Sequence, residues 1–335
     1  MNYPSIAVGA LGGTICMTAD NADAGALPRL SAQQLVTAVP GLADIAQIDA
    51  ETLLQLPSPS LNLAHVLDSL VWAERMVAAG AAGIVLTQGT DTLEETAFLL
   101  DLLWTHPQPL VVTGAMRTPL AAGADGPANI LAAVACAAYG ASRGRGVAVV
   151  MNNTIHEARW VRKANSMSVE TFESPVVGPA GMVLEGTPQY FRPPSKRYSQ
   201  RFAKPDLSVR VALVETCLGE TGEMLDAVAQ AGYHGIVIAA YGAGHVSDGE
   251  AQRIEALVPR LPIVVSSRTG SGSTAARTYG FSGSEIDLSR RGALFSGWLG
   301  PRKARLLLWL LLATGAPRNA CATAFEFWKR VDDSD

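Results

Sequence analysis

The feature that most constrains the fold is the alternation of short, continuously apolar segments with longer helical patterns. In the first half of the chain, the apolar segments are Ile6–Ala10, Gly83–Thr87, Leu110–Thr113 and Val147–Met151. The helical patterns between them occupy Leu61–Ala79, Leu93–Trp104 and Ala128–Tyr139. Strands that are apolar on both faces are typical of parallel sheets covered on both sides. The alternation therefore predicts an α/β fold with a larger N-terminal, doubly wound and mostly parallel sheet.

The second half of the chain repeats this alternation after a break in composition. The segment Glu185–Pro205 is rich in proline, arginine, lysine and serine, which is typical of a connection between domains. Strand patterns then occupy Val211–Glu215, Gly235–Ala240 and Ile263–Ser266, and helical patterns occupy Thr221–Ala231, Asp248–Val258 and Pro301–Ala313. A chain of 335 residues is long enough for two cores. We expect a first domain over residues 1–188, a linker over 189–207 and a smaller C-terminal α/β domain over 208–335.

The bulk composition predicts a folded protein without a nucleic-acid or membrane partner. Hydrophobic residues make up 48% of the chain and charged residues 17%, which excludes the disordered class. The formal net charge is −4 and the basic residues are scattered, so the basic stripe that phosphate backbones require is missing. The N-terminus reads MNYPSIAVGALGGTI, which we interpret as a first strand because no basic region precedes its apolar run. Since the longest apolar stretch, Leu306–Ala313, is far shorter than the roughly 20 residues that span a bilayer, we expect a cytoplasmic protein.

The cysteines and histidines show no metal-binding spacing. The four cysteines are widely separated, without a CxxC pair: Cys16, Cys136, Cys217 and Cys321. We expect them to be reduced and buried. The five histidines form no HExxH or similar motif. A metal hydrolase is therefore the weaker interpretation.

Glycine, hydroxyl and carboxylate groups follow three of the predicted strands. Thr14 comes after Gly12 and Gly13, the segment Gly89–Thr92 follows the second strand, and Gly114–Arg117 follows the third. Ligands of parallel sheets bind at the carboxyl ends of the strands, so these loops are candidates for one site. Taken alone, the hydroxyl and carboxylate groups of the second loop are better explained as a helix N-cap. The chain has no GxGxxG and no GxxxxGK[ST] motif, so a nucleotide-binding loop is not indicated.

Several long motifs resemble those of one enzyme family. LGGTI (Leu11–Ile15) and TQGTDTLEETA (Thr87–Ala97) resemble the two signature segments of the bacterial-type L-asparaginases. Further similar segments are GAMR (Gly114–Arg117), ADGPAN (Ala124–Asn129), VRKANS (Val161–Ser166) and KAR (Lys303–Arg305). The resemblance extends almost from end to end of the chain.

The resemblance implies a set of catalytic and substrate-binding residues. Thr14 would be the nucleophile, while Thr90, Asp91 and Lys163 would form a second catalytic cluster. A threonine hydroxyl needs a neighbouring base or cationic partner to act as a nucleophile, and a buried lysine can serve. Ser58, Gly89 and Ala115 would bind substrate, and backbone N–H groups near Thr90 and Ala115 are candidates for an oxyanion hole. Without the matched motifs, Lys163 would be interpreted as a solvated surface charge and Ser58 as part of a rigid proline-rich turn.

The chain departs from the family pattern at three places. Pro59 and Ser60 follow Ser58, where well-studied members carry glutamine and aspartate, so one substrate contact is expected to be lost. The predicted lid, Met17–Arg29, contains no tyrosine, although a lid tyrosine completes the first catalytic triad in much of the family. Tyr241 and Tyr279 are possible substitutes.

The third departure lies in the C-terminal domain. His245 stands where family members place an asparagine that reaches a neighbouring subunit's active site. An exposed loop imidazole is an equally good interpretation of this residue. Glu285 is the nearest counterpart of a family glutamate from the same domain.

The resemblance predicts hydrolysis of L-asparagine to L-aspartate and ammonia through an acyl-threonine intermediate, without a metal or another cofactor. The N-terminal domain would be catalytic, and the C-terminal domain would complete the site of a partner in a homodimer or homotetramer. The departures leave open an altered amidohydrolase that accepts glutamine or D-isomers, because one methylene changes binding by only about 1–3 kcal/mol. A weakly active amino-acid-binding relative is a further alternative. An amidotransferase subunit acting on charged tRNA has no support from an added domain or a basic face.

Overall fold

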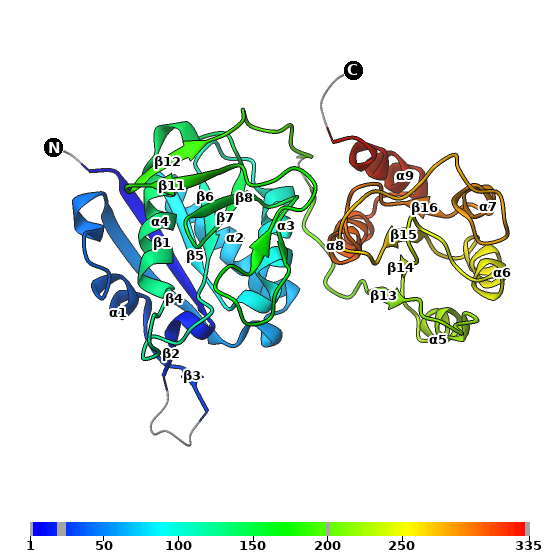
Figure 1. The fold of residues 1–335 in the computed structure, drawn as a ribbon, viewed down its shortest axis with the longest axis horizontal. Helices are drawn as coiled ribbons and strands as arrows, with labels where there is room; N and C mark the ends of the chain where they lie inside the picture. Colours follow the sequence, from blue (N-terminus) through cyan, green and yellow to red (C-terminus); the bar gives the residue numbers. More distant parts are fainter. Residues whose placement is uncertain (1–2, 19–24, 199–201, 332–335) are drawn as a thin grey trace. The chain divides into compact units, whose positions relative to one another are not determined.

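The chain divides into two compact α/β units, residues 1–200 and residues 201–335 (Figure 1). The computed structural model describes residues 3–18, 25–198 and 202–331. The division falls inside the segment 189–207 that the sequence predicts as a linker. The predicted fold class, a larger mostly parallel N-terminal sheet with a smaller C-terminal α/β domain, is confirmed.

An eight-stranded sheet in the order β12-β11-β8-β7-β6-β5-β1-β4 forms the centre of the N-terminal unit. Its strands are β1 (Ser5–Gly12), β4 (Gln47–Leu56), β5 (Gly83–Thr87), β6 (Leu110–Thr113), β7 (Val147–Met151), β8 (Thr154–Glu157), β11 (Gly181–Leu184) and β12 (Thr187–Tyr190). Five adjacent strands, β7, β6, β5, β1 and β4, are parallel. The remaining three, β8, β11 and β12, pair antiparallel. The four predicted strands are confirmed as β1, β5, β6 and β7. β4 escaped prediction because it is an edge strand, and several of its side chains are exposed.

Helices cover both faces of this sheet, as the continuous apolar strands require (Figure 1). They are α1 (Ala32–Thr37), α2 (Leu63–Ala78), α3 (Leu93–Leu103) and α4 (Gly126–Ala138). Alternate residues of β1 point to opposite faces of the sheet. Ile6 and Val8 belong to a core cluster that includes residues of α1 and α4, whereas Gly9 lies against Trp72 of α2. The strand is therefore buried on both sides by different helices.

The helices start and end close to the predicted residues, and their caps explain the differences. The pattern predicted a helix from Leu61, but α2 begins two residues later. Asn62 caps it, because the Asn62 side chain accepts the His65 backbone N–H at 3.0 Å and the His65 ring accepts the N–H of Asn62. α4 begins two residues before the predicted Ala128, with Pro127 in its first turn, where the missing N–H of proline is tolerated.

Short elements lie at the carboxyl ends of the parallel strands. They are the 3₁₀ helices η1 (Thr14–Cys16), η3 (Ser58–Ser60) and η4 (Thr90–Thr92), and the two-residue strands β2 (Met17–Thr18), β3 (Leu27–Pro28), β9 (Arg162–Lys163) and β10 (Phe172–Glu173). β2 pairs antiparallel with β3, and β9 with β10. Two further 3₁₀ helices, η2 (Leu42–Asp44) and η5 (Gly140–Ser142), lie elsewhere in this unit.

The first half of the predicted linker is attached to the N-terminal unit. Residues 189 and 190 complete β12, so the sheet extends into the segment interpreted as a linker. The guanidinium of Arg192 lies 3.2 Å from the Glu157 carboxylate. Arg197 lies 2.8 Å from the Asp101 carboxylate and donates to the last carbonyls of α3. These partly buried contacts hold the segment on the unit, which its basic, proline-rich composition did not predict.

The C-terminal unit contains a four-stranded parallel sheet in the order β13-β14-β15-β16. Its strands are β13 (Val211–Glu215), β14 (Gly235–Ala240), β15 (Ile263–Ser267) and β16 (Leu294–Phe295). Its helices are α5 (Glu223–Gln230), α6 (Asp248–Leu257), α7 (Glu285–Arg290), α8 (Pro301–Ala313), α9 (Arg318–Glu326) and the 3₁₀ helix η6 (Phe327–Lys329). The predicted strands and helices of this half are all present, with ends that differ by at most two residues.

One expectation about the cysteines is wrong. All four are free, and three are buried, but Cys217 is exposed. Cys217 lies just beyond β13, in a loop that the sheet does not cover. Burial raises the pKa of the Cys16 thiol to about 11 and that of Cys136 to about 12.

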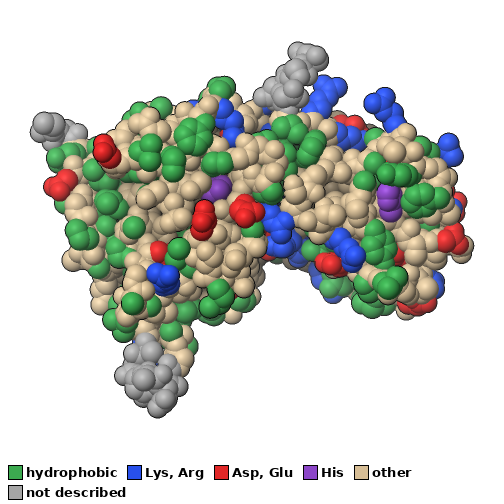
Figure 2. Space-filling model, in the orientation of Figure 1, with side chains coloured by type: hydrophobic (Ala, Val, Ile, Leu, Met, Phe, Trp, Pro, Cys, Tyr) green, Lys and Arg blue, Asp and Glu red, His purple; other side chains and the backbone are tan. Residues whose placement is uncertain are grey.

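The surface shows no separation of charge by sign on the visible face. Acidic and basic side chains are interspersed among apolar and other polar ones (Figure 2). None of the helices in the described residues combines the length and the hydrophobicity that a membrane span requires.

Candidate active site

Four neighbouring parallel strands deliver the candidate residues to one edge of the N-terminal sheet. β6, β5, β1 and β4 are adjacent and run in the same direction, so their carboxyl ends meet. Ala115 follows β6, Thr90 and Asp91 follow β5, Thr14 follows β1, and Ser58 follows β4. This is the edge at which parallel sheets bind ligands. The expectation that these loops share an edge is thus realised in the fold.

Glycines let two of these loops touch through their backbones. Gly13 has φ 85°, and a Cβ there would lie 2.0 Å from the backbone nitrogen of Gly89. Only glycine fits such an approach. Gly89 in turn lies against Ser58, because a Cβ at Gly89 would be 2.7 Å from the Ser58 Oγ. The half-buried Thr14 is therefore held directly beside the loop that carries Thr90.

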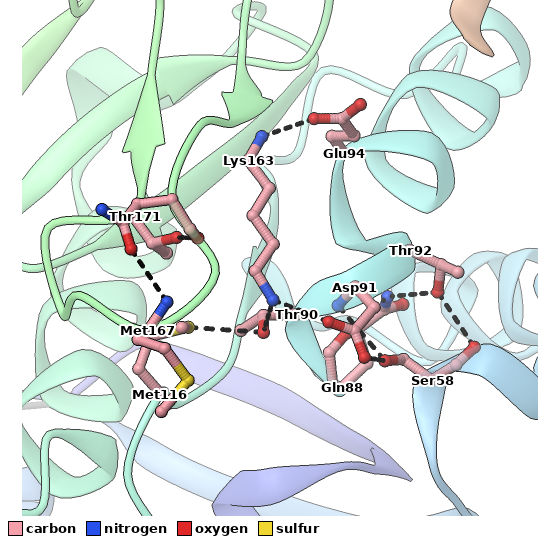
Figure 3. Close-up of polar contacts among 12 residues, drawn as sticks. Ser58, Gln88, Thr90, Asp91, Thr92, Glu94, Met116, Lys163, Met167 and Thr171 are labelled. Atoms are coloured by element: carbon pink, nitrogen blue, oxygen red, sulfur yellow. Dashed lines mark hydrogen bonds and ion pairs between the residues drawn. The ribbon is translucent and has the colours of Figure 1, made fainter.

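A lysine from a distant segment joins Thr90 and Asp91. The Nζ of Lys163 donates to Thr90 Oγ1 at 2.9 Å and lies 2.7 Å from Asp91 Oδ1 (Figure 3). The Lys163 side chain is 13% exposed, while the Asp91 side chain is 58% exposed. The alternative interpretation of Lys163 as a solvated surface charge is therefore wrong. The cluster has a buried hydroxyl at its base and a carboxylate open to solvent, so a small polar molecule can reach it.

Ser58 belongs to the same hydrogen-bond network. Its buried Oγ donates to Asp91 Oδ2 at 3.3 Å and accepts the Asp91 backbone N–H at 3.2 Å. Its carbonyl accepts the Thr92 hydroxyl at 3.2 Å. Pro57 precedes it in an extended conformation, so the rigid turn and the polar contact are both present. The serine hydroxyl is thereby tied to the carboxylate that faces solvent.

The loop that carries Ala115 is fixed by side chains that the sequence did not single out. The Asp125 carboxylate accepts the backbone N–H groups of Met116 at 3.0 Å and Arg117 at 2.9 Å. Asn129 donates to the carbonyl of Gly114 at 3.0 Å. Ala115 itself is fully buried between these anchors. Both anchoring residues lie in the ADGPAN motif. The motif indicated that the segment belongs to the site, but not that its side chains bind the backbone of the Ala115 loop.

A further residue that the sequence left without a role is Glu94, in the first turn of α3. Its buried carboxylate accepts the backbone N–H of Lys163 (Figure 3). In the sequence, a role of Glu94 in the site was indicated only by its position three residues after Asp91, because residues three apart share one side of a helix.

His245 lies in the C-terminal unit and is packed rather than exposed. Its side chain is 19% exposed, and its ring contacts Tyr279 edge-on with centroids 4.8 Å apart. Its Nε2 lies 3.3 Å from Glu285 Oε2, close enough for ion pairing but without the alignment of a hydrogen bond. The interpretation as an exposed loop imidazole is therefore wrong. The contribution of His245 to a neighbour's site stays a prediction.

The Glu285 carboxylate is held by the backbone of its own unit. Burial raises the pKa of Glu285, but the backbone N–H groups of Tyr279 and Thr278 lower it by more, so the pKa lies below its usual value. Both N–H groups donate to Glu285 Oε1, at 2.7 Å and 2.6 Å. The carboxylate thus fixes the segment that carries Tyr279.

The predicted lid is described only in part. Residues 19–24 of the segment Met17–Arg29 lie outside the described residues. The remainder forms the β2–β3 pair, and Cys16 accepts the backbone N–H of Arg29 at 2.9 Å. The possible tyrosine substitutes, Tyr241 and Tyr279, both lie in the C-terminal unit. Among the described residues, no group of three or more histidine, cysteine, aspartate or glutamate side chains could hold a metal ion.

Two family models together match most of the chain. The model described as "Asparaginase, N-terminal" matches residues 5–196. The model described as "Glutaminase/Asparaginase C-terminal domain" matches residues 210–325. The first match covers every candidate residue of the N-terminal unit, and the second covers His245 and Glu285.

Curated relatives and a solved structure agree with these models. The chain is 36% identical to a probable periplasmic L-asparaginase of Haemophilus influenzae, over 93% of this chain and 89% of that protein. It is 35% identical to L-asparaginase 2 of Escherichia coli, over 92% of this chain and 89% of that protein. The crystal structure of a probable cytoplasmic L-asparaginase from Campylobacter jejuni superposes with a TM-score of 0.85 at 30% identity, covering 96% of this chain and 99% of that one. One relative is called periplasmic and another cytoplasmic, so the cytoplasmic location of this chain stays a prediction.

Proposed function

The chain belongs to the asparaginase family of amide-bond hydrolases, and we propose that it hydrolyses L-asparagine to L-aspartate and ammonia. The observation that carries this proposal is the contact of one ammonium, Lys163 Nζ, with both Thr90 Oγ1 and Asp91 Oδ1. It provides a cation, a hydroxyl and a solvent-facing carboxylate within hydrogen-bond reach of one another. A mere amino-acid-binding protein does not need a lysine held in this way.

In the proposed first step, the Thr14 hydroxyl attacks the side-chain amide carbon. The C–N bond breaks, a threonyl ester forms, and the threonine proton leaves with the nitrogen as ammonia. The developing oxyanion would be stabilised by backbone N–H groups beside Thr90 and Ala115. Removal of one such donor typically costs about 10²–10³ in rate.

In the proposed second step, a water molecule held by Thr90 attacks the ester. Because the Lys163 ammonium donates to Thr90 Oγ1, the hydroxyl hydrogen is directed away from the lysine. In this structure it is donated to Met116 Sδ at 3.4 Å, a weak acceptor that an incoming water would replace. The water oxygen bonds to the acyl carbon, the ester C–O bond breaks, and one water proton passes to Thr14 Oγ1, which releases L-aspartate and restores the hydroxyl.

Substrate binding is assigned to the solvent-facing side of the cluster. Asp91 Oδ1 and Oδ2 would accept from the substrate's α-ammonium, and Ser58, tied to Oδ2, would contact the α-carboxylate with the loop at Gly89. We assign His245 to the site of a partner subunit, within a homodimer or homotetramer. The Glu285 carboxylate beside it would set the orientation of the imidazole.

An altered substrate range is the second candidate. Pro59 and Ser60 occupy the 3₁₀ turn after Ser58 and supply no amide or carboxylate side chain there. The pocket therefore offers fewer polar contacts by which to reject a longer or D-configured amide.

Ammonia release from L-asparagine, L-glutamine and their D-isomers tests both candidates. The proposed function predicts the highest kcat/KM on L-asparagine, with loss of turnover in Thr14→Ala. Equal values for glutamine would favour the altered range. Wild-type turnover in Thr14→Ala would rule out the acyl-threonine route.

A further inference from the structure

The buried carboxylate of Glu94 makes its contact outside its own helix. Glu94 lies in the first turn of α3 and is 4% exposed. Its Oε2 accepts the backbone N–H of Lys163 at 2.5 Å, across 69 positions of sequence. Most carboxylates in a first helical turn face the free N–H groups of that turn. This one reaches a different segment, and that segment carries the lysine of the candidate site.

One short stretch of chain therefore holds Lys163 at both ends. Asp91 binds the Nζ at 2.7 Å, and Glu94, three residues further along, binds the backbone nitrogen. Figure 3 shows the lysine stem extended between these two contacts. η4 leads directly into α3, so the two carboxylates belong to a continuous helical segment. The distance that the lysine must span is set by a rigid element rather than by a loop.

The segment that carries Lys163 is held by packing and by polar contacts. β9 and β10 contain two residues each, too few to be stable by themselves, and Val161, next to β9, is fully buried. On the far side, Ser174, which follows β10, bonds to the buried His156 of β8 at 2.9 Å. Glu94 provides the attachment on the near side. A lysine stem has four rotatable carbons, so its ammonium is positioned only if its backbone is fixed.

We propose that Glu94 is a positioning residue, which fixes the Lys163 backbone so that the ammonium reaches Thr90 and Asp91 together. Its kinetic consequence rests on the proposed function, whereas the contact itself does not. A misplacement of about 1 Å costs roughly 10² in rate. The role requires an acceptor oxygen at this position and not the negative charge as such.

Three variants separate the acceptor from the charge. Glu94→Ala removes the acceptor, and we expect kcat on L-asparagine to fall by about 10–10²-fold while KM changes by less than about twofold. Glu94→Gln keeps an acceptor oxygen of similar volume, so we expect it to recover most of the lost rate. Glu95→Gln is the matched control, because it removes the same charge from the same turn, and we expect wild-type kcat. Circular dichroism and the urea midpoint of each variant show whether it is folded.

Chemical labelling of Lys163 tests the positioning without any turnover. The intact protein is treated briefly with acetic anhydride, and acetylation of the Lys163 peptide is followed by mass spectrometry. We expect Glu94→Ala to label several-fold faster than wild type, since the ammonium leaves its contacts, and Glu95→Gln to label at the wild-type rate. Equal labelling rates in Glu94→Ala and wild type would overturn the proposal. A kcat of Glu94→Gln as low as that of Glu94→Ala would overturn it as well. If wild type releases no ammonia from any amide, the proposed function fails, and the labelling still decides the role of Glu94.

Discussion

The two units use the same element order for different purposes. In each, a buried parallel strand is followed by a threonine, and a nearby helix has a buried glutamate in its first turn: Thr90 and Glu94 in the N-terminal unit, Thr216 and Glu250 in the C-terminal unit. In the C-terminal unit the Thr216 hydroxyl donates to Glu250 at 2.8 Å, and Glu250 also accepts the backbone N–H of Ser247. Glu250 thus forms the capping box of its own helix with Ser247, and Thr216 contacts it from the end of β13.

In the N-terminal unit the corresponding groups bind another segment. Thr90 and Glu94 both contact Lys163, one through its ammonium and the other through its backbone. Both networks join distant segments, so exposure is what separates them: Asp91 is open to solvent, whereas Glu250 is fully buried.

The largest expected effect comes from comparing the two threonines. Thr90→Val should lower kcat by about 10³-fold or more, because it removes the hydroxyl that Lys163 holds. Thr216→Val should leave kcat unchanged and reduce the free energy of unfolding by about 1–3 kcal/mol, because it leaves Glu250 buried with one partner fewer. Ammonia release and urea unfolding of both variants measure this. A kinetic defect in Thr216→Val as large as that in Thr90→Val would break the comparison.

The cations of the two units give the next contrast. Lys163→Met should reduce kcat by about 10²-fold, because neither Thr90 nor Asp91 keeps its cationic partner. Arg253 of the C-terminal unit pairs with Asp226 at 2.9 Å, but its side chain is 31% exposed. Such surface pairs contribute little, so Arg253→Met should leave both kcat and stability near wild type. Steady-state kinetics of the two variants measures this difference. A wild-type kcat in Lys163→Met would show that the lysine has no catalytic role.

The acid sensitivity of the C-terminal unit sharpens the comparison further. The pKa of Glu285 lies below its ordinary value of 4.5, so its ionised form stabilises the folded state. That contribution is present above the ordinary pKa and is lost as the pH falls through the lower, folded-state pKa. Wild type should therefore lose more free energy of unfolding than Glu285→Gln when the pH is lowered from about 7 to about 4. Parallel urea titrations at the two pH values measure this, and identical losses would contradict the shift.

The smallest effect concerns the thiols. Because burial raises the pKa of Cys16 and Cys136, these thiols stay protonated and unreactive at neutral pH. Only the exposed Cys217, in the C-terminal unit, should react quickly with a thiol reagent in the native protein, and all four cysteines should react in urea. Rapid native labelling of Cys16 would show that the loop after β1 opens.

The sequence predicted the buried elements well, for a physical reason. β1, β5, β6 and β7 are apolar on both faces, so their pattern is unmistakable. The edge strand β4 lacks that pattern because one of its edges has no neighbouring strand. The composition of segment 191–198 predicts a linker, but its arginines pair with partly buried carboxylates that no local pattern reveals.

The candidate site was predictable only where local order or family motifs pointed to it. The hydroxyls after β1 and β5 follow from strand order. Lys163 lies more than seventy positions from Thr90, so its place came from the resemblance alone. The anchoring roles of Glu94 and Asp125 depend on distant backbone groups, and His245 finds its partner Glu285 forty positions away. Such contacts are set by tertiary structure, which residue patterns do not encode locally.

Trapping the covalent intermediate tests the central claim most directly. Thr90→Val should still allow Thr14 to attack L-asparagine, while the second step is slowed. Intact-mass and peptide mass spectrometry should then show one aspartyl group attached to Thr14 and a single burst of ammonia. An adduct on any other residue, or ammonia release without a covalent adduct, would contradict the account.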